Sequence, residues 1–359
     1  MATSTAGASA APGSERLRQV SLTQRLLAKP AAGAFVIVIF VFLVFAGLSL
    51  ARGSTAFLSA PGILNYVGFA SQIGIIATAV ALLMIGGEFD LSVGSLVGFS
   101  SILMGIISTT MGQPIWLAIL ISMAITTLFG VINGLIVVRT GLPSFIVTLA
   151  TMFIVAGLSS VIVLSVTNIT FISIDRLRIA ADPLGALFSW KLSFKFDQVT
   201  ADLSVTIVLW IGIALLGAYV LGRRRFGNWI TGVGGSPVAA RNLGVPVNRV
   251  KIALFASTAF SASILAACLS MQFASADIQR GRTFELTAIT MAVIGGCLLT
   301  GGYGSVAGTA LGALAIGMMN IGIVYASINA DWYLISLGSL LLIAVVLNNW
   351  IRRRFAGLR

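Results

Sequence analysis

The sequence has no histidine and only two cysteines, Cys268 and Cys297, in 359 residues. The missing histidines exclude the usual zinc sites, the Ser–His and Cys–His nucleophile pairs and most haem ligation. Both cysteines lie in apolar segments, which favours small packing residues over a Cys268–Cys297 disulfide. No nucleophile–base pair or metal constellation is visible, so an enzyme is the least favoured class of protein.

Charge is also scarce. Only 9% of the residues are charged and 58% are hydrophobic, whereas roughly a quarter are charged in an ordinary soluble domain. This composition indicates a multi-span helical protein of the lipid bilayer. A formal net charge of +12 would suggest nucleic-acid binding in a soluble chain. Here the cations are sorted by side of the membrane, so we expect no nucleic-acid partner.

Long apolar runs recur along the chain, each near the length of about twenty residues that crosses a bilayer. They cover residues 31–50, 63–85, 92–111, 115–138, 144–166, 203–221, 252–271, 284–299, 305–325 and 332–351. We therefore predict an all-α polytopic membrane protein with about ten transmembrane helices and both termini in the cytoplasm.

Three regions follow from this pattern. Residues 1–30 form a basic cytoplasmic N-terminus, whose first residues cannot bury a core and are expected to be disordered. Residues 31–351 form the transmembrane domain, and residues 352–359 form a basic cytoplasmic tail. Predicted cytoplasmic segments hold fifteen of the 22 lysines and arginines, as the positive-inside rule requires. The long outer segment 167–202 suggests no mechanism.

The longest cation-rich interruption of the apolar pattern covers residues 223–251. Within it, Ser236 is a typical helix N-cap, Pro237 a typical first helical residue and Gly244 a typical stop, with about two helical turns between them. We expect a short exposed helix on the cytoplasmic side. A membrane protein that exposes such a helix, with no catalytic residues beside it, is expected to be moved by a partner protein that binds the helix.

A second motif, GGEFDLSVGS from Gly86, places two carboxylates at a predicted membrane boundary. Ionisable groups there are costly, so a role in gating or coupling is one interpretation. A structural turn and helix cap is the other, because carboxylates are favoured at the positive end of a helix. The candidate residues are Gly87, Glu88, Asp90, Ser92 and Gly94.

The same motif resembles GGYGSVAGTALG from Gly301. Each is a Gly-Gly turn followed by Ser-Val and small residues that open a span. This favours two related helix hairpins that pack through small residues, although composition bias alone also produces matches this short.

Three ordered motifs resemble the permease subunits of bacterial ribose, xylose, arabinose and galactose ABC importers. GGEFDLSVGS is similar to that family's Gly-Gly-Ile-Asp-Leu-Ser-Val-Gly-Ser signature, and GGSPVAARNLGVPVNRVK from Gly234 is similar to its coupling loop. The third is VIGGCLLTGGYGSVAGTALGALAIGMMN, over residues 293–320. The chain departs from the pattern at Phe89, Leu243 and Cys297, which leaves the substrate open.

The resemblance implies a permease of the bacterial inner (plasma) membrane that works as a pair of identical or related subunits. A cytoplasmic ABC ATPase would drive the pair, and a periplasmic sugar-binding protein would deliver the cargo. ATP and Mg²⁺ would belong to the ATPase, and this chain would bind no cofactor and no metal. In agreement, none of its four lysines completes a G-x-x-x-x-G-K-[ST] phosphate loop.

Candidate residues fall into three further groups. The ATPase-coupling residues are Ser236, Pro237, Ala239, Ala240, Arg241, Asn242, Gly244 and Arg249. Charges that suit binding-protein docking, or a plainly solvated loop, are Asp277, Arg280, Arg282 and Glu285. Polar residues within spans are Asn65, Gln72, Asn133 and Asn320; they contact a passing sugar or, more commonly, bond neighbouring helices.

Two alternative functions stay open. One is ABC import of another small polar solute, such as a nucleoside, a polyol, a furanone signal or a branched-chain amino acid. The other is ion-coupled secondary transport. That class usually needs buried acids or histidines, and apart from Glu88 and Asp90 the chain offers almost none near its spans.

Overall fold

The computed structural model describes the backbone of residues 31–196 and 199–355, and side chains up to residue 347. The predictions for residues 1–30, and for 356–359 of the tail, lie outside the described residues.

Among the described residues, eight helices are long and apolar enough to cross a membrane. They are α2 (Ala31–Ala51), α3 (Ala60–Ile85), α4 (Val93–Gly105) with its π-helical end η2 (Ile106–Thr110), α5 (Ile115–Thr140), α6 (Ser144–Thr167), α9 (Val205–Arg223), α12 (Val247–Phe273) and α14 (Val306–Tyr325). Two further helices, α13 (Phe284–Ile294) and α15 (Trp332–Phe355), are also apolar. The predicted all-α polytopic fold is confirmed.

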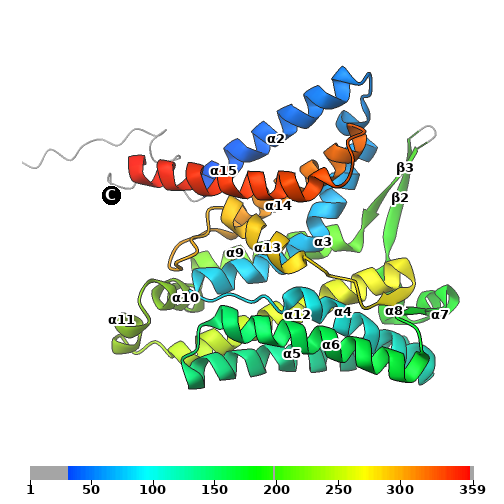
Figure 1. The fold of residues 1–359 in the computed structure, drawn as a ribbon, viewed down its shortest axis with the longest axis horizontal. Helices are drawn as coiled ribbons and strands as arrows, with labels where there is room; N and C mark the ends of the chain where they lie inside the picture. The colour runs from blue at the N-terminus through cyan, green and yellow to red at the C-terminus, as the bar shows by residue number, and fades with distance from the viewer. Residues whose placement is uncertain (1–30, 197–198, 356–359) are drawn as a thin grey trace, which may run out of the picture.

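The helices run roughly side by side, with short elements at both ends of the bundle (Figure 1). One layer holds α4, α5, α6 and α12, and the other holds α2, α14 and α15. The short helices α10 (Arg225–Gly235) and α11 (Pro237–Asn242) project from one end. The short helices α7 (Arg176–Ala181) and α8 (Pro183–Ser189) and a β-hairpin lie at the other end.

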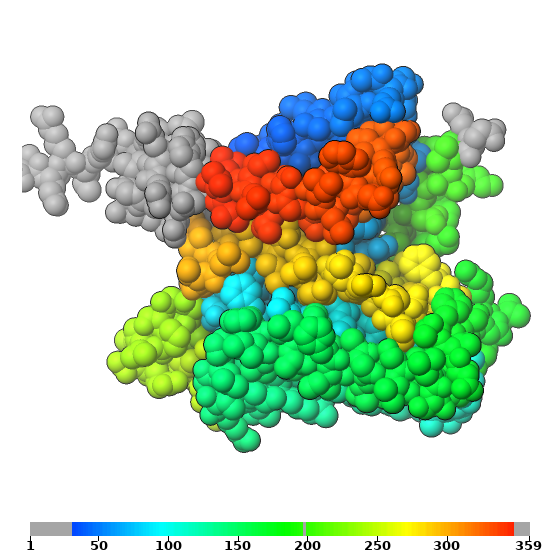
Figure 2. Space-filling view, in the orientation of Figure 1, coloured from blue at the N-terminus to red at the C-terminus, as the bar shows by residue number. Residues whose placement is uncertain are grey.

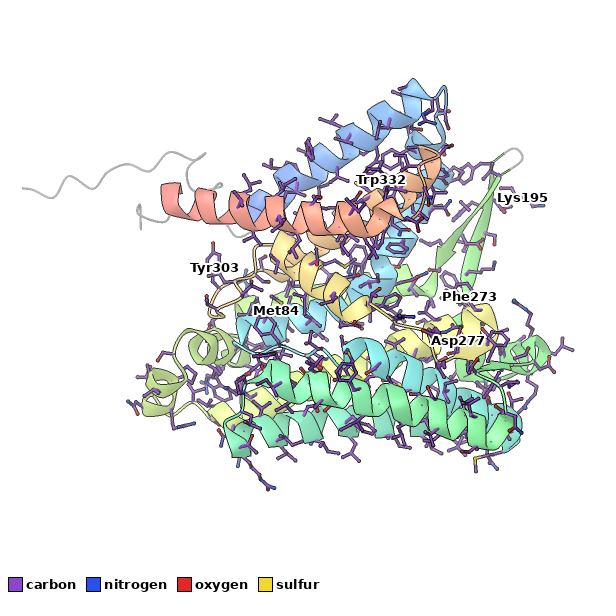
Figure 3. All side chains as sticks on the ribbon, viewed as in Figure 1. Met84, Lys195, Phe273, Asp277, Tyr303 and Trp332 are labelled. Atoms are coloured by element: carbon purple, nitrogen blue, oxygen red, sulfur yellow. The ribbon has the colours of Figure 1, made fainter. Side chains whose placement is uncertain are left out.

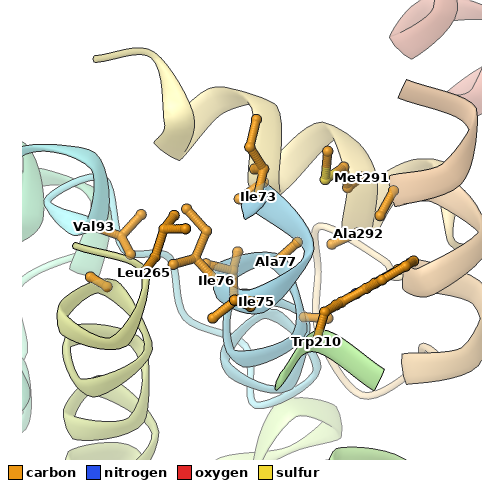
Figure 4. Close-up of a cluster of buried hydrophobic side chains, with 14 of the residues drawn as sticks. Ile73, Ile75, Ile76, Ala77, Val93, Trp210, Leu265, Met291 and Ala292 are labelled. Carbon is orange, nitrogen blue, oxygen red and sulfur yellow. The ribbon is translucent and has the colours of Figure 1, made fainter. Parts of the chain in front are cut away.

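Helix α3 runs between the two layers and is buried through most of its length. It packs closely because several of its residues are small. A Cβ added to Gly74, for example, would lie 2.3 Å from Trp210 Nε1 of α9. Figure 4 shows this core, where α3 meets α4, α9, α12 and α13 through Ile73, Ile75, Ile76, Ala77, Val93, Trp210, Leu265, Met291 and Ala292. Small residues let membrane helices approach closely, so α3 contacts both layers at once.

The segment 167–202, predicted to lie on the outer side, is folded and fastened to the bundle in its described parts, residues 167–196 and 199–202. Strand β1 (Phe171–Ser173) pairs antiparallel with β4 (Ser275–Asp277), and β2 (Lys191–Phe196) pairs with β3 (Val199–Ser204) in the hairpin. Asp182 caps α8 and also accepts a hydrogen bond from the Trp116 N–H at the start of α5 (2.9 Å). Arg178 donates to the Ser108 carbonyl (2.8 Å). These bonds hold α7 and α8 against η2 and the start of α5.

One predicted span has a different form. The sequence indicates a helix over residues 284–299, but α13 ends at Ile294. Gly295 terminates the helix and Gly296 has φ +87°, a left-handed conformation that favours glycine. Residues 295–305 continue without regular helix. The apolar composition of this stretch hides the break, because hydropathy does not register backbone conformation.

The predicted internal repeat is confirmed at Ser-Val, which begins α4 at Ser92–Val93 and α14 at Ser305–Val306, but its glycine turns have a different register. Helix α3 ends at Gly86 (φ −71°) and Gly87 (φ +85°), and α13 ends with nearly the same geometry at Gly295 (φ −65°) and Gly296 (φ +87°). Gly301, the predicted counterpart of Gly86, has φ +79° instead. The matching glycine turns therefore follow α3 and α13. Gly301 belongs instead to the irregular stretch before α14.

Candidate functional site

Helix α11 has the bounds that its capping residues predict. Ser236 Oγ accepts a hydrogen bond from the Ala239 N–H (3.3 Å), and Pro237 is the first helical residue. At the other end, the N–H of Gly244 (φ +81°) bonds the Arg241 carbonyl, and the N–H of Val245 bonds the Ala240 carbonyl, each at 3.0 Å. This pair of bonds is a Schellman motif. A six-residue helix is thus held at both ends by local bonds.

Helix α11 and the residue after it expose two large apolar side chains. Val238 is 68% exposed, and Leu243 at 84% is the most exposed large hydrophobic residue of the described chain. Ala240 faces inward and is buried. Arg241, Asn242 and Arg249 are exposed near these two side chains. Exposed apolar residues ringed by cations on a rigid short helix are typical of a protein-binding surface.

Three glycine turns meet at the base of this helix. We define the glycine junction as Gly87 after α3, Gly234 at the end of α10, and Gly301 and Gly302 before α14. A Cβ on Gly234 would lie 1.8 Å from the Ile85 carbonyl oxygen and 2.6 Å from the Gly302 N, and a Cβ on Gly301 would lie 2.7 Å from the Gly87 Cα. The Gly302 N–H donates to the Ile85 carbonyl (2.8 Å). Only glycine permits backbones this close.

Figure 3 places the junction in the molecule. Met84 and Tyr303, which lie beside these turns, are on the same side as α10 and α11, and Phe273 and Asp277 are on the opposite side. The segment that carries α11 therefore touches the ends of both interrupted hairpins, α3–α4 and α13–α14.

An ion pair makes a second connection at this end. Glu88, in the turn after α3, accepts a hydrogen bond from Lys251, in the first turns of α12 just beyond α11. The side chains of Glu88 and Lys251 are 9% and 18% exposed, so both charges are mostly withdrawn from water. Removing either side chain would leave the other charge buried without a partner.

Asp90 is fully buried and is the centre of a polar network across four helices. Its carboxylate accepts hydrogen bonds from the Ser92 N–H and hydroxyl and from the Thr258 hydroxyl of α12. Asn133 of α5 donates to Ser92 Oγ (3.0 Å) and accepts from Thr151 of α6 (2.7 Å). The pattern favours the structural interpretation of the motif: these bonds hold the turn before α4 in place.

The irregular backbone of this turn is also satisfied by side chains. The Phe89 N–H donates to Ser144 Oγ (3.0 Å) and the Leu91 N–H donates to Thr148 Oγ1 (3.1 Å), both on α6. Non-helical backbone near membrane depth persists only where protein groups bond it.

The predicted docking charges are only partly exposed. Glu285 lies against α4, since a Cβ on Gly94 would be 1.9 Å from its Oε2. Arg280 donates to Ser275 Oγ (2.9 Å) and its guanidinium lies over the Phe273 ring, 5.4 Å from the centroid. Asp277 is half-buried and Arg282 is exposed. Docking stays a prediction, and Arg282 is the residue best placed for it.

Two of the four polar path residues line one cavity. Asn65 and Gln72 of α3 face a cavity of about 510 Å³, which lies between α3, the outer segment and the end of α12. Asn133 belongs to the Asp90 network instead. Asn320 precedes Ile321, which lines the cavity, but is not itself a lining residue.

Charged groups of the hairpin close one side of this cavity. Lys191 pairs with Asp202 at 2.7 Å, and both line it. Hydrogen bonds from Lys191, and secondarily from Ser193, hold the pKa of Asp202 below its ordinary value. The Asp202 carboxyl is therefore ionised at neutral pH, and its charge is opposite to that of Lys191.

Several contributors to these sites escape sequence reasoning. Thr258, Gln272 and Lys191 are single polar residues with no distinctive spacing, so only the fold brings them to the network or the cavity. The sequence does contain an indication of the glycine junction, because Gly-Gly pairs begin at Gly86, Gly234 and Gly301. No cluster of three possible metal ligands occurs among the residues that the structure describes.

Comparison with known proteins gives consistent matches. Residues 62–345 match the protein family described as branched-chain amino acid transport system / permease component. The chain is 30% identical over 281 residues to the fructose import permease protein FrcC of Rhizobium meliloti, covering 78% of this chain and 76% of that relative.

Two further relatives are similar over most of their length. The xylose transport system permease protein XylH of Escherichia coli is 29% identical over 343 residues, covering 83% of this chain and 87% of XylH. The ribose import permease protein RbsC of Haemophilus influenzae is 30% identical over 301 residues, covering 82% and 87%. No solved structure matches this chain.

Proposed function

Because the chain belongs to the family described as branched-chain amino acid transport system / permease component, we propose that it is the translocating subunit of an ABC importer that carries a monosaccharide into the cytoplasm. The resemblance carried by its three motifs is confirmed, and the chain is a membrane permease with no catalytic role of its own. The sugar cargo is proposed because FrcC, XylH and RbsC are named for fructose, xylose and ribose.

The observation that carries the proposal is α11. A short helix held by caps at both ends, with exposed Val238 and Leu243, supports docking into a groove of a cytoplasmic ATPase. Arg241 and Arg249 beside it are suited to pair with carboxylates of that partner. ATP and Mg²⁺ would then be bound by the ATPase.

Movement of α11 has a direct route into the bundle. The glycine junction joins the α10–α11 segment to the ends of α3 and α13–α14 by backbone contact, and the Glu88–Lys251 pair joins α12 to the same turn. Closely packed backbones shift together rather than deform. A displacement of α11 is therefore expected to move α3, whose outer half lines the cavity.

The other partners follow from the proposed class. A periplasmic sugar-binding protein would dock at the outer end, with Arg282 exposed to meet it. A second permease subunit, identical or related, would complete the pathway. The inner membrane, with both termini in the cytoplasm, is supported by the positive charge of the segment around α11.

The test is uptake in a bacterial host that lacks its own monosaccharide permeases. The chain is expressed with its cognate ATPase and binding protein, and uptake of labelled fructose, xylose, ribose, arabinose and galactose is measured. We expect accumulation of at least one sugar that is lost when the ATPase is omitted. Accumulation of a nucleoside, polyol or amino acid, and of none of the sugars, would contradict the proposed cargo.

A further inference from the structure

The outer cavity has the composition of a carbohydrate site. Asn65, Gln72 and Gln272 line it together with Phe69 and Phe273, and the amide nitrogen of Asn65 also donates to Tyr325 Oη (2.8 Å). Amides donate and accept hydrogen bonds at once, as sugar hydroxyls do, and aromatic rings offer apolar faces for the C–H side of a sugar ring. Its volume of about 510 Å³ lies within the range of ligand pockets, about 300–1,000 Å³.

One donor beside this cavity has no hydrogen bond within the described part of the protein. Nε2 of Gln272 is buried and has no hydrogen-bond partner in the described part of the chain. A buried donor without a partner is costly, and native proteins rarely leave one unless a water or ligand bonds it. Gln272 lines the cavity, but Nε2 itself has almost no exposed surface, so a ligand bonds this donor only after the side chain turns toward the cavity.

The charges of the cavity favour a neutral ligand. Lys191 and Asp202 neutralise one another at 2.7 Å, which leaves exposed Arg176 as the remaining charged lining residue. An amino acid would need an unpaired acid for its ammonium group as well as a cation for its carboxylate. A neutral solute with many hydroxyl groups needs neither.

The cavity is also coupled to the opposite end of the protein through one helix. Asn65, Phe69 and Gln72 lie on one face of α3, at spacings of four and three residues. The same helix ends at the glycine junction. Movement of α11 is thus expected to alter the cavity, as a site that must release its ligand requires.

We propose that this cavity, between α3, the β2–β3 hairpin and the end of α12, binds one neutral monosaccharide within the permease subunit itself, before the sugar crosses. This inference rests on the proposed function for the class of ligand. Figure 2 shows the surface hollowed here, between the green hairpin and the yellow end of α12, and Figure 3 places Phe273 beside it.

The first test uses protection of an introduced thiol. The natural cysteines, Cys268 and Cys297, are buried, so Ala180→Cys, at a lining residue to which no contact with the sugar is assigned, labels against a low background with a membrane-impermeant maleimide added outside. Ser189→Cys is the independent second position at the cavity wall, and Gln113→Cys, exposed and outside the cavity, is the control. We expect the transported sugar, at about ten times its half-protecting concentration, to slow labelling of both cavity positions about tenfold and to leave Gln113→Cys unchanged.

The second test fills the cavity without disturbing the helix. A Cβ on Gly68 would meet nothing within 4 Å, and Gly68 lines the cavity. Gly68→Leu should therefore fold and assemble normally, lose the protection, and lower sugar uptake at least tenfold. Gly157→Leu in α6 is the matched control, because that glycine is also helical with open space at its Cβ but lies outside the cavity.

Uptake by the unmodified protein separates the two proposals. If a sugar is taken up but protects neither cavity cysteine at any soluble concentration, or if neither cysteine is labelled from outside, the cavity site is wrong and the proposed function stands. Normal uptake by Gly68→Leu also overturns the site. If no sugar is taken up, the proposed function fails, and a different solute that protects both positions contradicts the proposed class of ligand.

Discussion

Adding a methyl group at the glycine junction gives a prediction with a control in the adjacent residue. Gly234 and Gly235 are the last two residues of α10. A Cβ on Gly234 would lie 1.8 Å from the Ile85 carbonyl oxygen, whereas a Cβ on Gly235 meets nothing within 4 Å. Gly234→Ala and Gly235→Ala therefore add the same methyl group, and they differ only in the atoms that this group contacts.

The size of the effect follows from these contacts. Real Cβ atoms essentially never approach another heavy atom closer than 3.0 Å, so the two backbones must separate by about 1.2 Å, the difference between 3.0 and 1.8 Å. Such overpacking costs about 1–3 kcal/mol. The shift also strains the Gly302 N–H bond to the Ile85 carbonyl, worth about 0.5–1.5 kcal/mol. We expect Gly234→Ala to lower the free energy of unfolding by about 2–4 kcal/mol.

Stability and transport are measured on the same variants. A thiol-reactive dye follows unfolding of the detergent-solubilised protein, because both cysteines are buried until it unfolds. Sugar uptake is measured in proteoliposomes with the ATPase. Gly234→Ala should lower the apparent melting temperature and reduce uptake per folded molecule at least tenfold, while Gly235→Ala should match the unmodified protein. Equal behaviour of the two variants in uptake would refute the junction as the route of movement.

Three further substitutions test single contacts. Leu243→Asp should change the free energy of unfolding by no more than about 0.5 kcal/mol, because the side chain is exposed. It should reduce co-purification of the ATPase roughly tenfold or more. Undiminished co-purification would exclude α11 as the docking helix. Lys251→Met should lower the free energy of unfolding by about 3 kcal/mol, because it leaves the mostly buried Glu88 unpaired. Adding Glu88→Gln should restore most of the lost melting temperature. No recovery in the double variant would show that the ion pair does not cause the loss. Thr258→Val removes one hydrogen-bond donor to buried Asp90 and should lower the free energy of unfolding by about 1.5–3 kcal/mol. A melting temperature equal to that of the unmodified protein would contradict this prediction.

Local signals in the sequence are sufficient for α11. Its N-cap, first residue and stop lie at Ser236, Pro237 and Gly244, as predicted. Capping depends on residues within one or two turns, and these are adjacent in sequence. The same holds for most transmembrane helices, whose length and apolar composition are read directly from the chain.

The interrupted helices are harder to predict. The apolar run 284–299 contains a helix that stops at Ile294. The motif match finds the Ser-Val starts of α4 and α14 but pairs the glycine turn at Gly86 with Gly301 instead of Gly295. In both cases the deciding property is backbone conformation at glycine, and every Gly-Gly pair looks alike in the sequence. Which pair turns left-handed depends on the helices packed around it.

The roles of polar residues cannot be separated from sequence. Asn65 and Asn133 are both asparagines within apolar helices. The first lines the cavity and donates to Tyr325 of α14, whereas the second bonds Ser92 and Thr151. The direction in which each side chain points depends on the rotation of its helix in the bundle. The nearly uniform hydrophobicity of these helices leaves no apolar face in the sequence from which to infer it.

The most direct measurement is the energy source of transport. Purified chain, cognate ATPase and binding protein are reconstituted in proteoliposomes without ion gradients, and uptake of the preferred sugar is followed with and without ATP. We predict uptake that requires ATP, the ATPase and the binding protein together, and that is lost with Leu243→Asp. Uptake driven by a proton or sodium gradient in the absence of ATP would contradict the account, and would identify Glu88 and Asp90 as the residues to examine for ion coupling.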